Sequence, residues 1–543
     1  MEKLRLVWGD LHKHVHVNDM DRLDELAEDA KKNLDFYAFL CYPFVWYLQS
    51  RSGKIRWLGH PVNLHSVFSE VNKDGCLLVE SVAPAQEIKR WEAKLRQAAK
   101  EHNKEEEFVT LLGYEWHGNR KKYGDHNIIF FDIDLPFEDE SELPILYKKL
   151  KGKRVLVIPH HTAYKIRRRG KDWNIWDSKL SPVAEIYSSH GASEVDSFPM
   201  FLNNNYSMGP GCSKGSWQLA LNKGLRVGAI ASNDGWGLPG SWNKGLAGVW
   251  VTSFTREGLW DAFQHRRTYA VTGDRIELMF WVNDTFMGGV LNTNTRPLIV
   301  RYKVSCLDKL DRVELIHNGR RVACHYYADT QREEVLIGEV VCNIRIDFGW
   351  GPAKHYGFSD GTTIWDGCLE VKKGELLSAL GCFGRRGQRL KTSGNLANWQ
   401  IRLPYRNGDR ESEIKESIIF TVKGTSETVL KFSGEGYDFS KKLRDLLYKS
   451  EVIALEDKTS KLIESEFGIR QDKIINDEVY YFNAPKIKLH RAVISSELKA
   501  EGFFEISHLG AGFNYLYIRV FQLNGQMAWS SPVWIKVKGD END

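Results

Sequence analysis

The sequence predicts an α/β protein whose first half is a barrel-like domain and whose second half is a mostly antiparallel β-sandwich. Up to about residue 275, short apolar runs alternate with helical patterns, which is typical of a parallel sheet that closes into a barrel. Beyond that point, alternating apolar and polar runs are separated by glycine and asparagine, as in antiparallel sandwiches. The length of 543 residues suits two large domains. We therefore expect a barrel domain at 1–275 and a sandwich domain at 276–543.

The strands expected in the first domain are short apolar runs, at 6–11, 36–40, 108–112, 127–131, 154–158, 183–187, 226–231 and 247–251. Helices are expected where apolar residues recur on one face, at 21–32, 85–102, 217–222 and 256–266. In the second domain the expected strands include 276–282, 298–304, 312–317 and 515–522. A helical insertion is expected near 441–449.

Charge and apolar patterning argue against several classes of partner. The 75 lysines and arginines exceed the 71 aspartates and glutamates by only four, so no strong net field favours nucleic acid or an anionic membrane. The longest uncharged apolar stretch, 36–48, is shorter than the roughly 20 residues of a membrane-spanning helix. Charged residues near the start precede any apolar segment, so we expect no signal peptide and a cytoplasmic location. The eight scattered cysteines are expected to be reduced.

Residues of metal-ligand type follow several of these strands, at the positions where a barrel gathers side chains into one pocket. His12 and His14 end the first run and share a face with Asp10, because strand side chains alternate. Similar residues follow three other runs: Glu115, His160, His161 and Asp234. Taken alone, the two histidines of the first run are as compatible with ordinary core or surface positions as with metal binding. The recurrence of such residues at strand ends favours a metal site.

Five motifs together resemble the metal-binding motifs of the polymerase and histidinol phosphatase (PHP) superfamily. They are GDLHKH at 9–14, Glu115 after an apolar strand, GDHN at 124–127, IPHH at 158–161 and ASND at 231–234. Segments 185–191, 267–273 and 528–534 are similar to a bacterial PHP-like group with a C-terminal β domain, related to carbaryl-hydrolase-type metallohydrolases. The resemblance spans nearly the whole chain. It implies a distorted (β/α)7 barrel of TIM type.

The resemblance also implies a centre of two divalent metal ions, such as Zn, Mn or Fe. One metal would be held by His12, His14, Glu115 and Asp234, and the other by Glu115, His126 and His160. His126 opens an apolar run, so its place rests on the motif alone. His161 is an alternative to His160.

A third metal of the superfamily is expected to be lost. Its ligands would be a residue near Asp19 and two histidines, at positions that hold Tyr42 and Trp236 in this chain. Tyrosine is a poor ligand at neutral pH, and the tryptophan N–H cannot ligate a metal. Both departures fall on the same site, which favours a centre reorganised to two metals.

The chemistry that the resemblance implies is hydrolysis by a metal-bridging hydroxide, with Glu115 as the bridging ligand. No Gly-x-Ser-x-Gly nucleophile motif is present in the sequence. His190 is predicted to bind substrate or move a proton, with an ordinary hydrogen-bonded loop histidine as the alternative. His117 lies two residues after Glu115 and could face the same pocket.

Two basic loops are expected at the mouth of the barrel. Guanidinium groups match phosphate and carboxylate geometry, so the predicted substrate-binding residues are Arg120, Arg167, Arg168 and Arg169. Solvated charge runs are the alternative. Trp236 is predicted to stack on substrate, with core packing as the alternative.

We therefore expect a cytoplasmic, divalent-metal-dependent hydrolase that acts on a small anionic ester, with phosphoesters ahead of carboxyl or carbamate esters. No nucleic acid or membrane partner is expected. The alternative is a non-catalytic module in which a retained metal and the tryptophans bind a carbohydrate or an anionic ligand. Fold alone does not choose between these functions.

Overall fold

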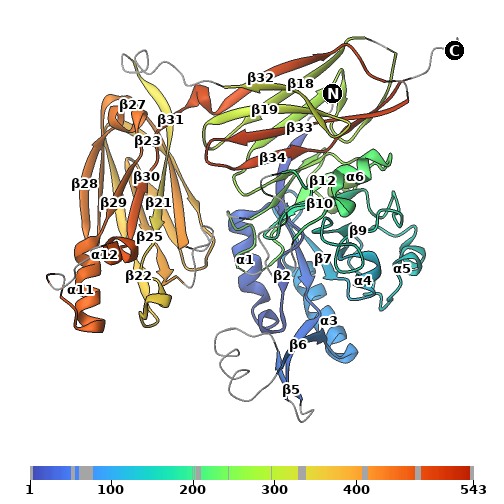
Figure 1. Ribbon diagram of the computed structural model, residues 1–543, viewed down its shortest axis with the longest axis horizontal. Helices are drawn as coiled ribbons and strands as arrows, with labels where there is room; N and C mark the ends of the chain where they lie inside the picture. Colours follow the sequence, from blue (N-terminus) through green and yellow to red (C-terminus); the bar gives the residue numbers. More distant parts are fainter. Residues whose placement is uncertain are drawn as a thin grey trace.

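The computed structural model describes residues 4–50, 55–59, 77–198, 200, 202, 210–235, 237–242, 244–294, 296–327, 338–406, 414–470, 472, 478–510 and 512–537. The described residues form a mixed α/β, strand-rich protein with several sheets, which confirms the predicted class at that level. Figure 1 shows two bodies side by side. The larger one contains the N-terminal half together with the last strands of the chain.

The largest sheet runs through the larger body. Its central strands β1 (Arg5–Asp10), β3 (Phe36–Cys41) and β7 (Val109–Glu115) are parallel. It continues in antiparallel pairings through β8 (His126–Phe130) and β9 (Val155–Pro159). On the other side of β1, it continues through β13 (Leu246–Val251) and β14 (Thr268–Val271). A smaller sheet pairs β10 (Val183–Ser188) with β12 (Gly228–Ala231) in parallel and with β11 (Gly191–Ala192) in antiparallel.

Strand direction departs from the regular parallel alternation expected of a barrel. Only ten residues separate β7 from β8, and a parallel crossover needs about a dozen or more, so these strands pair antiparallel. Strand β13 also runs antiparallel to β1. The positions of the expected strands agree with the structure, whereas the closed seven-unit barrel stays a prediction.

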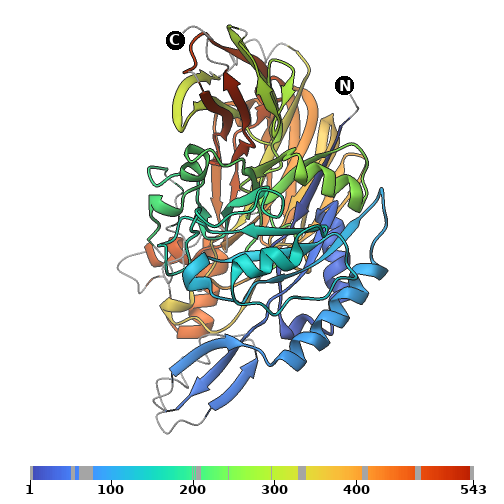
Figure 2. The same cartoon turned by 90° about the vertical axis from the view of Figure 1, so that its right-hand side faces the viewer.

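Helices pack around these two sheets, and Figure 2 shows those in the blue and cyan segments. They are α1 (Leu23–Asn33), α3 (Ala85–Glu101), α4 (Arg120–Tyr123), α5 (Leu143–Leu150), α6 (Trp217–Asn222) and α7 (Arg256–Gln264). The apolar stripe of α1 is buried at Leu23, Leu26, Ala27 and Ala30, as its spacing predicts. None of the described helices is long and apolar enough to cross a membrane.

A small antiparallel sheet was not predicted. It consists of β4 (Phe44–Gln49), β5 (Ile55–Gly59) and β6 (Leu77–Val82). Its first strand belongs to the same apolar stretch as β3, and Pro43 separates the two strands. Proline has no backbone N–H, which favours a break in the ladder at this point.

The last strands of the chain extend the sheet of the N-terminal half. Strand β34 (Met527–Ser530) pairs with β14 and with β33 (Gly512–Gln522), and β33 pairs with β19 (Leu310–His317) and β35 (Val533–Val537). Neighbouring strands are β15 (Glu277–Val282), β16 (Thr285–Phe286), β17 (Val290–Asn292), β18 (Leu298–Ser305), β20 (Arg320–Tyr326) and β32 (Lys499–Ile506). One hydrophobic core includes residues from both sides of position 275, and the expected boundary there stays a prediction.

The second body is mostly antiparallel and has a hydrophobic core of its own. Its long strands are β21 (Val340–Gly349), β23 (Gly367–Cys382) and β27 (Lys415–Gly434). Shorter ones are β22 (Thr362–Ile364), β24 (Arg389–Ser393), β25 (Leu396–Gln400), β26 (Arg402–Pro404), β28 (Tyr437–Lys442), β29 (Glu451–Ala454), β30 (Lys486–Leu489) and β31 (Val493–Ile494). Helix α10 (Leu443–Tyr448) lies within the stretch where a helix was expected. Two further helices, α11 (Glu456–Phe467) and α12 (Glu478–Asn483), were not expected.

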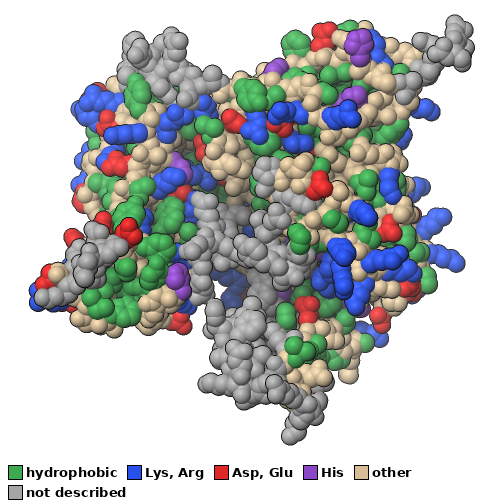
Figure 3. Space-filling view, in the orientation of Figure 1, with side chains coloured by type: hydrophobic (Ala, Val, Ile, Leu, Met, Phe, Trp, Pro, Cys, Tyr) green, Lys and Arg blue, Asp and Glu red, His purple; other side chains and the backbone are tan. Residues whose placement is uncertain are grey.

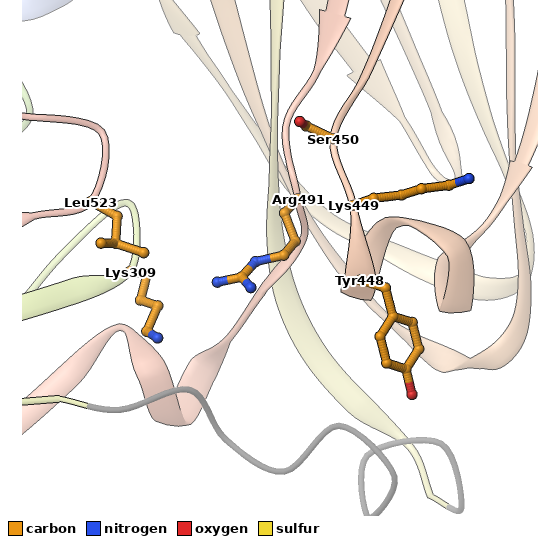
Figure 4. A pocket seen from close by; sticks show the side chains of 6 residues that line it. All are labelled: Lys309, Tyr448, Lys449, Ser450, Arg491 and Leu523. Atoms are coloured by element: carbon orange, nitrogen blue, oxygen red, sulfur yellow. The ribbon is translucent and has the colours of Figure 1, made fainter.

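The two bodies meet at polar contacts and at a small apolar cluster of Trp242, Cys382 and Ile419, and a hollow lies between them. Arg345 of β21 forms an ion pair of 2.6 Å with Asp274, and Arg386 lies 2.7 Å from Asp29 of α1. Figure 4 shows the hollow, in which the side chains of Lys309 and Arg491 approach from opposite bodies. In Figure 3, lysine and arginine side chains gather on the larger body around α4 and α5.

Candidate metal centre

Hydrogen bonds to the Asp10 side chain join the end of β1 to the loop that carries Asp234. Its buried carboxylate accepts the backbone N–H groups of His12 at 3.0 Å, Asn233 at 3.2 Å and Gly240 at 3.5 Å. The backbone N–H of Asp234 in turn donates to the carbonyl of His12 at 2.8 Å. Asp10 therefore holds the backbone of the site, and the histidines that follow it supply the ring nitrogens.

His12 and His14 direct ring nitrogens at one point among carboxylates. Their Nε2 atoms lie 3.2 Å apart. His14 Nε2 is 3.3 Å from Glu115 Oε2, and His12 Nε2 is 3.5 Å from Asp234 Oδ1. All four side chains are buried. The four residues predicted for the first metal are therefore brought together from the ends of three strands, β1, β7 and β12.

Glu185 is a member of the cluster to which sequence reasoning gave no role. Its Oε2 accepts a hydrogen bond from Nδ1 of His12 at 2.9 Å, and both side chains are fully buried. The bond leaves Nε2 of His12 to face Asp234 and His14. A carboxylate on the far nitrogen of a ligand histidine fixes its tautomer and its orientation. A lone carboxylate in the apolar run 183–187 was the signal for it in the sequence.

Of the two predicted second-metal histidines, His160 lies among the first-metal residues, whereas His126 belongs to neither cluster of ligand atoms found among the described residues. The ring of His160 lies 4.2 Å from that of His12, and its Nδ1 is 3.9 Å from Asp234 Oδ2. Neither ring nitrogen of His160 has a hydrogen-bond partner, although the side chain is buried. His126 donates from Nδ1 to the carbonyl of Gly124 at 3.1 Å, which leaves its buried Nε2 without a partner.

These residues fit a divalent metal ion. Two groups have ligand atoms all within 4.8 Å of one another: His12, His160, Glu185 and Asp234, and His12, His14 and Glu115. Buried polar atoms without partners are rare in proteins, because each is destabilising unless something satisfies it. The set of imidazole nitrogens and carboxylate oxygens suits Zn, Mn or Fe.

The electrostatics of the cluster agree with a site that binds a cation. Burial alone would lower the pKa of His12, but the carboxylates of Asp234 and Glu185 raise it to about 10. Burial and the neighbouring His12 hold the pKa of His14 well below its usual range. A metal ligand must be a neutral imidazole, so a bound metal ion would displace a proton from His12.

The expected third site holds an aromatic side chain. The ring of Tyr42 stacks on that of His14 at 4.4 Å, and its hydroxyl donates to Glu80 Oε1 at 2.6 Å. Asp19 accepts the backbone N–H of His16 at 3.1 Å. Trp236 lies outside the described residues. The loss of the third metal stays a prediction.

Two arginines are held beside the cluster by Asp125, which had no predicted role. Its Oδ1 is 2.9 Å from Nε of Arg120, and its Oδ2 pairs with Nε of Arg169. Nη1 of Arg120 points towards the metal ligands, 3.8 Å from Glu115 Oε1, and has no hydrogen-bond partner. Arg167 and Arg168, which were predicted with them, are exposed.

His190 also reaches the cluster. Its Nε2 lies 3.4 Å from Asp234 Oδ2, and its Nδ1 is 2.8 Å from the hydroxyl of Tyr164. The two remaining candidates have other partners. His161 Nε2 is 3.3 Å from Asp125, and His117 Nε2 is 3.4 Å from the exposed Asp139.

Comparison with known proteins gives relatives of unknown function. Residues 218–299 match a family described as "protein of unknown function" (DUF3604). An uncharacterised protein of Chlamydia pneumoniae is 28% identical over 247 residues, which are 41% of this chain and 39% of that protein. One from Chlamydia muridarum is 26% identical over 255 residues, 43% and 40% of the two chains. The matched region thus spans about two fifths of these relatives.

One solved structure is also similar. It is a two-domain protein from Bacteroides vulgatus described as containing a predicted PHP-like metal-dependent phosphoesterase. The alignment covers 81% of this chain and 96% of that chain, at 10% identity and a TM-score of 0.30. At this TM-score the likeness shows neither the fold nor the activity of this chain.

Proposed function

We propose that this protein is a divalent-metal-dependent hydrolase of small anionic esters, with phosphoesters preferred. The observation that carries the proposal is the convergence of the Nε2 atoms of His12 and His14 with Glu115 and Asp234, beside the guanidinium of Arg120. Hydrolysis of a phosphoester is favoured by a cation at the reacting phosphate and by hydrogen-bond donors for its anionic oxygens.

The residues divide into three roles. His12, His14, Glu115 and Asp234 would hold one metal ion, because their ligand atoms converge. Glu115 would share a second ion with His126 and His160, whose buried ring nitrogens lack hydrogen-bond partners. When bound, such ions supply Lewis-acid polarisation and lower the pKa of water towards neutrality. Arg120 would bind a non-bridging oxygen of the ester through Nη1, which lies 3.8 Å from Glu115 Oε1 and has no hydrogen-bond partner.

His190 is the residue best placed to move a proton at the reacting ester. Its ring is fixed at both nitrogens, by Tyr164 on one side and Asp234 on the other. Ser188 donates to the same Asp234 oxygen at 3.3 Å, so the hydroxyl and the imidazole share one carboxylate. This arrangement holds His190 at the edge of the metal ligands, where a leaving-group oxygen would lie.

A panel of chromogenic esters tests the proposal. We expect turnover of a phosphate monoester or diester in the presence of Mn, Zn or Fe, and its loss in Glu115→Gln, which removes one carboxylate charge at nearly unchanged volume. Asp139→Asn is the matched control, because that carboxylate is exposed and contacts His117 outside the cluster. Turnover that survives Glu115→Gln would refute the proposal. No turnover of any ester, with tight binding of a sugar, would favour the non-catalytic module.

A further inference from the structure

The last strands of the chain lie against the hairpin that carries His190. Strands β10 and β11 pair through Tyr187 with Ala192 and Ser188 with Gly191, so Ser189 and His190 form the turn between them. Figure 1 shows β33 and β34, in red, next to β10 and β12, in green. The ring of Tyr187 stacks on that of Trp529 in β34 at 5.9 Å. The hairpin and the C-terminal strands therefore share one core.

Glu194, two residues after β11, joins this hairpin to the C-terminal strands. Its fully buried carboxylate accepts hydrogen bonds from the hydroxyl of Tyr517 and from Nε1 of Trp529, the latter at 2.8 Å. Nε of Arg519 lies 2.9 Å from the same carboxylate. Buried carboxylates are retained only when charge and hydrogen-bonding capacity are both satisfied, and here all three partners come from β33 and β34.

The strand that leads to Asp234 is held from the same side. The hydroxyl of Ser531, which follows β34, accepts the backbone N–H of Ala229 in β12 at 2.9 Å. Within the hairpin, the hydroxyl of Ser189 donates to the carbonyl of Asp234 at 2.6 Å. Contacts thus run without a break from the C-terminal strands, through Glu194 and the hairpin, to a ligand of the candidate metal centre.

We infer that Glu194 is a positioning residue of the metal centre and that β33 and β34 are a structural part of it. The inference rests on the proposed function, because it concerns the same metal ligands. It means that the chain cannot be divided at residue 275 without disturbing the site. The body at 340–494 has a hydrophobic core of its own.

The test compares Glu194→Gln with Glu314→Gln in the full chain. Glu314 is a matched control, because it is also buried and lies 3.5 Å from the same Arg519, but it belongs to β19 and its other ion-pair partners are Arg312 and Arg321. Cobalt(II) is the probe, with its dissociation constant and its visible absorption spectrum as readouts. Hydrogen exchange in the peptide 186–194 is the second readout.

We expect Glu194→Gln to weaken cobalt binding by about 10-fold or more, as mutations of outer partners of metal ligands typically do, and to change the spectrum. Exchange in 186–194 should rise. Glu314→Gln should leave all three readouts at wild-type values, even if both variants lower the melting temperature equally. Equal cobalt affinities and spectra in the two variants would overturn the inference.

Two further measurements cover the cases in which Glu194→Gln does not fold or the wild-type protein binds no cobalt. If Glu194→Gln does not fold, Trp529→Phe removes a single donor to Glu194 while keeping an aromatic ring on Tyr187, and the same shifts are expected in smaller degree. If the wild-type protein binds no cobalt, the proposed function fails. The exchange readout still decides the inference, which is overturned if peptide 186–194 exchanges alike in both glutamine variants.

Discussion

Glu185 and His12 are joined by a hydrogen bond of 2.9 Å that is completely buried. The bond runs to Nδ1 of the imidazole, so Nε2 is left for the side where Glu115, His14 and Asp234 converge. It links β10, in the smaller sheet, to the end of β1, in the larger one. The geometry of the metal ligands therefore depends on how the two sheets are held together.

The first prediction concerns this bond. Glu185→Ala leaves His12 without its orienting carboxylate, and we expect zinc affinity to fall by about 10- to 100-fold. Glu185→Gln keeps an acceptor at nearly the same position and should lose less. Isothermal titration with zinc measures both. Equal affinities in wild type and Glu185→Ala would show that the carboxylate does not orient the ligand.

The second prediction separates the arginines of one loop. Arg169 is anchored by Asp125 beside the cluster, whereas Arg168 is exposed. We expect Arg169→Met to raise KM for an anionic ester by about 10-fold or more, in line with the roughly 1.5–3 kcal/mol of a charge-assisted hydrogen bond. Arg168→Met should change KM by less than a factor of about two. A larger effect at Arg168 would contradict this placement of the anion.

The third prediction is that metal binding stabilises the folded protein. The buried ring nitrogens of His126 and His160 gain partners when a metal binds, and any ligand specific to the native state adds stability. At a free metal concentration of 100 times Kd the gain is about 2.7 kcal/mol per site. We expect chelation to lower the melting temperature of the wild type, with a smaller effect on Glu115→Gln. A melting temperature indifferent to chelation in both proteins would count against a metal centre.

The fourth prediction concerns the buried Lys171, whose ammonium donates to the carbonyl of Ile175 at 2.7 Å. Burial lowers its pKa from 10.5 to about 7. Between these two pKa values the unfolded chain binds a proton at Lys171 that the folded chain lacks. With respect to this lysine, the folded state is therefore most stable above about pH 10.5 and loses stability as the pH falls towards 7. We expect Lys171→Met to raise the free energy of unfolding at pH 6 by a few kcal/mol, on the order that burial of a lone charge implies. The advantage should shrink by pH 10, as urea unfolding would show; an advantage that grows with pH would contradict the assignment.

Much of the fold was predictable because local patterns determine it. The stripe Leu23, Leu26, Ala27 and Ala30 predicts α1 by its spacing alone, and the run before His12 predicts β1. Strand direction was not predictable in the same way. Whether β8 runs parallel or antiparallel to β7 depends on the short connection between them and on packing against β9, which involves residues distant in sequence.

The residues of the site also divide into those that local sequence patterns predict and those that they do not. His12, His14, Glu115 and Asp234 follow strand ends, so their convergence could be predicted from chain order. Glu185 and Asp125 could not be assigned in this way, because their roles are contacts with residues 173 and 44 positions away. The contribution of Glu194 depends on strands more than 300 residues later in the chain, and no local pattern points to it.

The central claim is that these residues bind two divalent metal ions, and metal analysis of the purified protein tests it most directly. After equilibration with Mn, Zn or Fe and removal of free metal, we expect about two equivalents per chain in the wild type. We expect fewer in Glu115→Gln, because Glu115 is the proposed ligand of both ions. No bound metal under replete conditions, or three equivalents, would contradict the account.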